Sequence, residues 1–159
     1  SIGAGKQALD LGRRQALAGE PRLLFLDEPL AYLLGWYHAD GWNDPQGIGI
    51  ALPDDDAVAL KAQTLILRLF GVHSAMSKVS GERCRKIKVN SVWVKQFLGE
   101  NGLLKRHAPE ITVPERILRS PKRVQMAFIA GFFEGRRPFE GDSSVFVNLE
   151  YAFLPFGLV

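Results

Sequence analysis

Asp40 stands at the end of an apolar run, in the stretch AYLLGWYHADGW of residues 31–42. Residues 31–37 are apolar enough to form a buried helix, and Gly41 is well suited to end it. A carboxylate delivered by such a helix is a candidate ligand for a divalent cation. The alternative is that a core helix simply ends at Gly41. The sequence therefore raises the question of what else lies beside Asp40.

A second apolar stretch, AFIAGFFEGRR, repeats the small residues of the first one at an offset of 96 positions. Small residues four apart form a stripe along one face of a helix, where two helix backbones can approach closely. We expect the two helices to pack in parallel through this stripe, with their carboxyl-terminal ends side by side. The predicted contact residues are Ala31, Gly35, Ala39, Ala127, Gly131 and Gly135.

The second helix lacks an acid at the position equivalent to Asp40, where Arg136 stands. Phe133-Glu134-Gly135 recurs as Phe139-Glu140-Gly141, with Asp142 next, so Asp142 is the preferred second acid after an insertion of seven residues. Glu134 is the weaker alternative, because a shift of two residues rotates a side chain by about 200° around a helix. Asp40, Asp142 and Glu134 are thus the candidate catalytic residues, and Asp40 and Asp142 the candidate metal ligands.

Basic residues are concentrated in one part of the chain. Residues 78–137 contain 14 Lys and Arg and 5 Asp and Glu, whereas the whole chain has a net charge of +3. Such segregation favours a polyanionic partner, because lysine and arginine displace the counterions of a phosphate backbone. The strand-like run RCRKIKVN supplies most of the predicted DNA contacts, which are Lys78, Arg83, Arg85, Lys86 and Lys88. The alternative is a solvated edge strand that its charges protect from aggregation.

Three stretches together resemble one protein family. LLGWYHADG (33–41) is similar to the motif of LAGLIDADG homing endonucleases, and VPERILRSPKRVQMAFIAGFFEG (113–135) resembles the segment that introduces the second motif in intein-encoded members. IKVNSVWVKQFLGENG (87–102) lies where such proteins place a strand and its following helix. The resemblance implies αββαββα repeats, an antiparallel saddle sheet on double-stranded DNA, and acids at the ends of the paired helices that bind Mg²⁺.

The function expected from this resemblance is Mg²⁺-dependent hydrolysis of phosphodiester bonds in double-stranded DNA. After residue 150 only nine residues remain, whereas the first repeat uses about 70, so the second repeat is incomplete. This shortness predicts either a truncated copy or a homodimer that supplies the missing parts. The alternatives are a degenerate domain that binds DNA without cleaving it and a chimeric fragment without function.

The first 30 residues resemble a different family. QALAGEPRLLFLDEPLA (15–31) is similar to the Walker B region of ABC-transporter ATPases, in which Asp27 would hold Mg²⁺ and Glu28 would activate water. Such an ATPase requires a G-x-x-x-x-G-K-[ST] loop upstream, and GAGKQ (3–7) does not match it. Nucleotide hydrolysis is therefore not expected, and we interpret this segment as the flank of a host protein.

The pattern of elements predicts an α+β fold with an antiparallel sheet. Helices are expected over 8–20, 30–40, 53–70, 92–102 and 122–135, and strands over 23–26, 47–52, 72–80, 83–91 and 143–153. The domains are expected to be a flanking segment (1–30), a first repeat (31–104), a basic linker (105–121) and a partial second repeat (122–159). A single cysteine and apolar runs too short to cross a bilayer predict a cytoplasmic protein without membrane contact.

Overall fold

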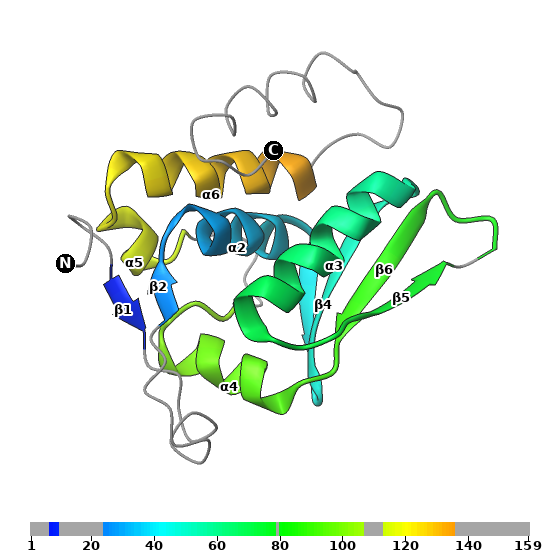
Figure 1. The fold of residues 1–159 in the computed structure, drawn as a ribbon, viewed down its shortest axis with the longest axis horizontal. Helices are drawn as coiled ribbons and strands as arrows, with labels where there is room; N and C mark the ends of the chain where they lie inside the picture. The colour runs from blue at the N-terminus through cyan, green and yellow to red at the C-terminus, as the bar shows by residue number, and fades with distance from the viewer. Residues whose placement is uncertain (1–6, 10–23, 79, 107–112, 136–159) are drawn as a thin grey trace.

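The computed structural model describes residues 7–9, 24–78, 80–106 and 113–135. These residues form a mixed α+β structure with one four-stranded sheet and helices packed against it (Figure 1). The elements are β1 (Gln7–Leu9), β2 (Leu24–Leu26), α2 (Glu28–Asp40), β3 (Gly41–Asp44), β4 (Gly47–Pro53), α3 (Asp56–Phe70), β5 (Ala75–Lys78), β6 (Cys84–Val89), α4 (Val92–Glu100), α5 (Glu115–Leu118) and α6 (Lys122–Gly135).

The four-stranded sheet is antiparallel throughout, in the order β3-β4-β6-β5. β3 and β4 form a hairpin, with Gly41 opposite Ile50 and Asp44 opposite Gly47. The hairpin is joined to the β5–β6 pair by the long contact of β4 with β6. β1 and β2 form a separate two-stranded antiparallel sheet.

Local sequence signals set the ends of α3. The Asp55 side chain accepts hydrogen bonds from the backbone N–H groups of Ala57 and Val58, which the first helical turn leaves without partners. Gly71 follows the helix with φ 67°, a left-handed conformation that glycine adopts without strain. The helix predicted over 53–70 is present and begins three residues later than predicted, at Asp56.

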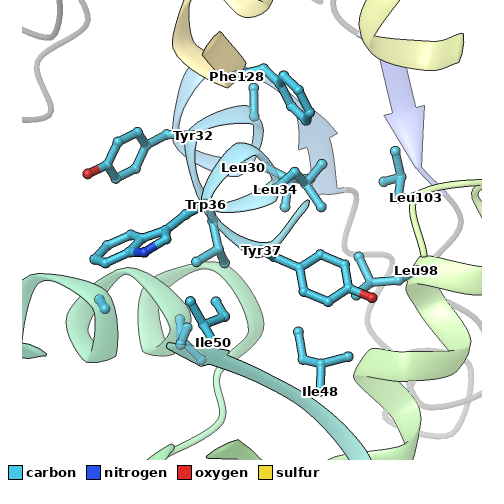
Figure 2. Packing of buried hydrophobic residues seen from close by; sticks show 14 of the residues in the cluster. Leu30, Tyr32, Leu34, Trp36, Tyr37, Ile48, Ile50, Leu98, Leu103 and Phe128 are labelled. Atoms are coloured by element: carbon cyan, nitrogen blue, oxygen red, sulfur yellow. The ribbon is translucent and has the colours of Figure 1, made fainter. Parts of the chain in front are cut away.

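α2 is the central element of the fold. All of its residues from Leu30 to Ala39 are buried, because other elements surround it. Figure 2 shows its side chains packed over Ile48 and Ile50 of β4 and beside Leu98 of α4. α6 lies alongside α2, and α3 crosses the sheet (Figure 1). A helix that is apolar on every side is thus explained by its burial on every side.

From α2 to α4 the observed order is helix-strand-strand-helix-strand-strand-helix, whereas the residue pattern predicted a single strand, over 47–52, between the first two helices. Three differences stand out. Leu9 lies in β1, where a helix over 8–20 was predicted, because pairing with β2 buries this side chain. The strand predicted over 47–52 pairs with β3, a strand that the residue pattern did not predict. The segment predicted as a connector contains the short helix α5. The strand predicted over 143–153 lies outside the described residues.

Within the described residues, no helix is long and apolar enough to span a membrane.

Candidate nucleic-acid interface

α2 and α6 pack closely through the predicted stripe of small residues. A Cβ atom built on Gly35 would overlap the carbonyl oxygen of Phe128, and one on Gly131 would overlap the carbonyl oxygen of Tyr32. Four residues further along α6, a Cβ on Gly135 would lie 2.8 Å from the Cβ of Ala39. The contacts advance in the same direction along both helices, so the helices run parallel.

Of the three predicted acids, Asp40 and Glu134 lie among the described residues. Asp40 is half-buried at the last position of α2, directly before β3. Glu134 lies in the last turn of α6 and is only 2% exposed. Asp142 lies outside the described residues.

The described residues show no assembled metal-ion site. They contain no group of three His, Cys, Asp or Glu side chains placed to hold a metal ion. Glu134 is withdrawn from solvent, whereas Mg²⁺ usually keeps several of its waters.

The two faces of the sheet differ in composition, as the strand register shows. Residues opposite each other in the ladder share a face. Ile48, Ile50 and Leu52 of β4 lie opposite Val89, Ile87 and Arg85 of β6, and all of these except Arg85 are buried beneath the helices. The neighbouring residues of each strand point to the other face. We call this second face the open face, and its residues are Trp42, Asp44, Gly47, Gly49, Ala51, Pro53, Ala75, Ser77, Cys84, Lys86 and Lys88.

Trp42 lies flat against β4 on the open face. It is opposite Gly49 in the ladder, and a Cβ on Gly49 would overlap the Trp42 indole. Glycine is therefore required at residue 49 for the ring to lie on the backbone. Small side chains cover much of the rest of this face, at Ala51, Ala75 and Ser77. The open face therefore has a floor of small residues close to the backbone of the sheet, with the half-buried ring of Trp42 on the edge strand β3.

The predicted DNA-binding residues are divided between the two faces. Lys86 and Lys88 lie on the open face, where Lys86 is half-buried and Lys88 is exposed. Arg83 is exposed just before β6. Arg85 and Lys78 lie opposite each other on the face that carries the core.

Arg85 and Lys78 are held by acidic residues at the start of α3. Arg85 Nε lies 2.7 Å from Asp54 Oδ1, and Arg85 Nη1 lies 2.6 Å from Asp56 Oδ1. Lys78 Nζ lies 2.6 Å from Asp54 Oδ2. Hydrogen bonds from Lys78 and Arg85 lower the pKa of the Asp54 carboxyl. These two basic residues therefore connect β5 and β6 to α3, and we leave them out of the interface.

Cys84 lies at the end of the open face nearest Asp40. Burial raises the pKa of the Cys84 thiol, its hydrogen bond to Glu82 raises it further, and the Asp40 carboxylate adds a smaller effect of the same sign. Asp40 is therefore within electrostatic range of this end of the sheet.

His38 and Tyr37 connect α2 to the segment after α4. His38 is 4% exposed, and its Nε2 lies 2.9 Å from the carbonyl oxygen of Leu103. The Tyr37 hydroxyl donates to Asn43 Oδ1 of β3 and accepts from the backbone N–H of Lys105. Burial raises the pKa of Tyr37 to about 12. Tyr37 therefore joins α2 to the edge strand β3 and to the segment after α4, and His38 joins α2 to that same segment.

The two acids of the Walker B-like stretch, Asp27 and Glu28, form ion pairs with an arginine of α6. Asp27 precedes the first residue of α2, which is Glu28. Arg123 Nε of α6 lies 3.0 Å from Glu28 Oε1 and 4.0 Å from Asp27 Oδ1. Burial raises the pKa of Glu28, and a hydrogen bond with Asp27 raises it further. The pair joins the start of α2 to α6.

The sequence analysis missed Trp42 and the flat floor around Gly49. The signal was the alternation in GIGIAL, where glycine and alanine occupy every second position of a strand. A strand that keeps bulky side chains on one face and small ones on the other leaves room for something above the small residues.

Comparison with known proteins gives a distant relative. No family model matches the chain. A replication factor C small subunit of Methanocaldococcus jannaschii is 27% identical over 142 residues, which cover 84% of this chain and 8% of that protein. The chain thus spans a small part of the curated relative that it matches.

These comparisons contradict the predicted family and function. The chain was expected to be an intein-encoded LAGLIDADG homing endonuclease, a nuclease that hydrolyses DNA. No family model supports that membership, and the matching relative is named as a replication factor. The motif rested on Leu33, Gly35, Ala39 and their neighbours, and close packing of two helices by itself selects small residues at such positions.

Proposed function

We propose that this chain binds double-stranded DNA through the open face of the four-stranded sheet. The observation that carries the proposal is the division of the sheet into two faces. The helices pack on one face, and the other presents Lys86 and Lys88 beside Trp42 over a floor of small residues.

The geometry suits a duplex. Antiparallel strands enter DNA grooves in several classes of protein, because the major groove is wide enough for a two-stranded ribbon. The floor of small residues lets a DNA duplex approach the backbone of the sheet, and the ammonium groups of Lys86 and Lys88 can then reach phosphate oxygens. The basic segment 78–137, which includes β6, adds long-range attraction for a polyanion.

The distant relative supports the same class of partner. Its name places it in replication, where DNA is the common ligand. The proposal is confined to binding, because the comparisons contradict the prediction of a DNA-cleaving enzyme.

The test is the salt dependence of binding to a fluorescently labelled duplex of mixed sequence, measured by anisotropy. We expect a linear decrease of log K with log salt concentration, and a slope lower by about 1.8 in the double variant Lys86→Ala/Lys88→Ala, since each phosphate contact contributes about 0.9. Lys122→Ala is the matched control, since Lys122 is an exposed lysine at the start of α6.

Equal slopes in the wild-type chain, the control and the double variant would show that the open face does not contact the duplex. Binding that is lost equally in Lys122→Ala would show attraction to net charge without a defined surface.

A further inference from the structure

A polar cavity of about 620 Å³ lies beside the ends of α4 and α5. Asn101 and Leu104, which follow α4, form part of its wall, and Val113 and Pro114, which precede α5, form another part. This volume is within the range of pockets that hold small organic ligands.

Three arginines line this cavity. They are Arg106 after α4 and Arg116 and Arg119 on and directly after α5, and the acids in the lining are Glu100 and Glu115. Arg119 Nη2 lies 2.5 Å from Glu115 Oε1, but both side chains are more than 70% exposed, and such surface pairs contribute little. A guanidinium has five N–H donors, so this one contact leaves Arg119 able to bind an anion. Three arginines against two glutamates leave the described lining net positive, which favours an anionic ligand.

His38 adds an acceptor to the cavity wall. The carbonyl oxygen of Leu103 can only accept a hydrogen bond, so His38 Nε2 carries the proton and Nδ1 has the free lone pair. Burial lowers the pKa of His38, which keeps the imidazole neutral near pH 7. A group that donates a hydrogen bond, such as a hydroxyl, is complementary to Nδ1.

We propose that this cavity binds a small organic phosphate, with the phosphate group on the arginines and a hydroxyl group of the organic part on His38. Arginine forks match phosphate oxygens in pairs, which gives both strength and orientation. The cavity is also larger than a phosphate ion needs, and Leu104, Val113 and Pro114 provide apolar surface for the organic part.

The experiment is a calorimetric titration of the full chain with ribose 5-phosphate and, separately, with inorganic phosphate. We expect saturable binding of both, with ribose 5-phosphate at least tenfold tighter. Arg106→Ala and Arg119→Ala should each weaken both ligands about tenfold or more, since each removes a charge-assisted contact. Arg68→Ala, an exposed arginine on α3, is the matched control and should change neither affinity.

His38→Gln tests the second half of the site. It keeps a donor for Leu103 but lacks the ring acceptor, so the advantage of ribose 5-phosphate over inorganic phosphate should fall. The two arginine variants lie at the surface and keep the proposal testable if His38→Gln does not fold.

Three results would overturn the proposal. They are no saturable binding of either ligand, unchanged affinities in both arginine variants, and displacement of ribose 5-phosphate by duplex DNA. The last result would show that the arginines contact a nucleic-acid backbone. The double variant Lys86→Ala/Lys88→Ala should leave ribose 5-phosphate binding intact, so failure of the DNA proposal and failure of this one are distinguishable.

Discussion

Gly131 of α6 lies directly against the backbone of Tyr32 in α2, so that a Cβ atom on Gly131 would overlap the Tyr32 carbonyl oxygen. Gly35 has the reciprocal relationship with the carbonyl oxygen of Phe128. The space that a side chain would need at each glycine is therefore occupied by the backbone of the other helix. This double contact fixes the spacing of α2 and α6. Because Asp40 is the last residue of α2 and β3 follows directly, the contact also fixes the position of Asp40 and of the start of β3.

Gly131→Ala should lower the free energy of unfolding by about 3 kcal/mol, the upper part of the range for overpacked cores, because a backbone carbonyl cannot move aside as a side chain does. Urea denaturation measures this change. The control is Gly99→Ala in α4, where a Cβ would meet open space and the helix should gain about 0.5–1 kcal/mol. An equal effect of the two substitutions would contradict close packing of α2 and α6.

Tyr37→Phe should destabilise the chain by about 1–3 kcal/mol, because it leaves the backbone N–H of Lys105 and the Asn43 side chain without their buried partner. The double variant Tyr37→Phe/Asn43→Ala should cost less than the sum of the single changes. Additive costs in urea denaturation would show that the two residues do not act through one hydrogen bond.

Gly49→Ala should displace the Trp42 indole, which has no room beside a methyl group at residue 49. We expect a red shift of tryptophan emission as the ring becomes more exposed, and weaker duplex binding if the ring lies in the interface. Comparing Gly49→Ala with Gly49→Ala/Trp42→Phe identifies the contribution of this ring to the emission, since Trp36 lies in the hydrophobic core and Trp93 packs against it. An emission spectrum identical to that of the wild-type chain would contradict the stacking of Trp42 on Gly49.

The ion pairs of Asp54 should make stability depend on pH in the acid range. Lys78 and Arg85 lower the pKa of Asp54 from its ordinary value of 3.8, so this carboxylate stabilises the fold fully above pH 3.8. Its contribution is lost as the pH falls through the lowered pKa. Urea midpoints measured between pH 6 and pH 2 should therefore fall less steeply in Asp54→Asn than in the wild-type chain.

Asp44→Asn provides a matched control for that measurement. The Asp44 side chain accepts a hydrogen bond from the backbone N–H of Gln46, and no basic side chain among the described residues forms an ion pair with it. If Asp54→Asn and Asp44→Asn reduce the fall of the urea midpoint at acid pH equally, the ion pairs of Asp54 with Arg85 and Lys78 are not the cause of that fall.

The sequence by itself determined the local structure wherever a short-range signal was sufficient. Asp55 and Gly71 set the ends of α3 through capping and backbone conformation, which depend on a few adjacent residues. The equal spacing of Gly35 and Gly131 in their helices indicated a close helix contact before either helix was placed, because only packing compensates for glycine inside a helix.

Only the tertiary structure decided which side chains share a surface. Arg85 and Lys86 are adjacent in the sequence, yet the pleat sends Arg85 to Asp54 and Lys86 to the open face. The residues that line the cavity with Arg106 come from α2, α4 and α5, which are far apart in the chain. The prediction that Asp40 is a metal ligand could not be decided from its motif for the same reason. The chemistry of a carboxylate depends on its neighbours, and long-range packing determines which residues those are.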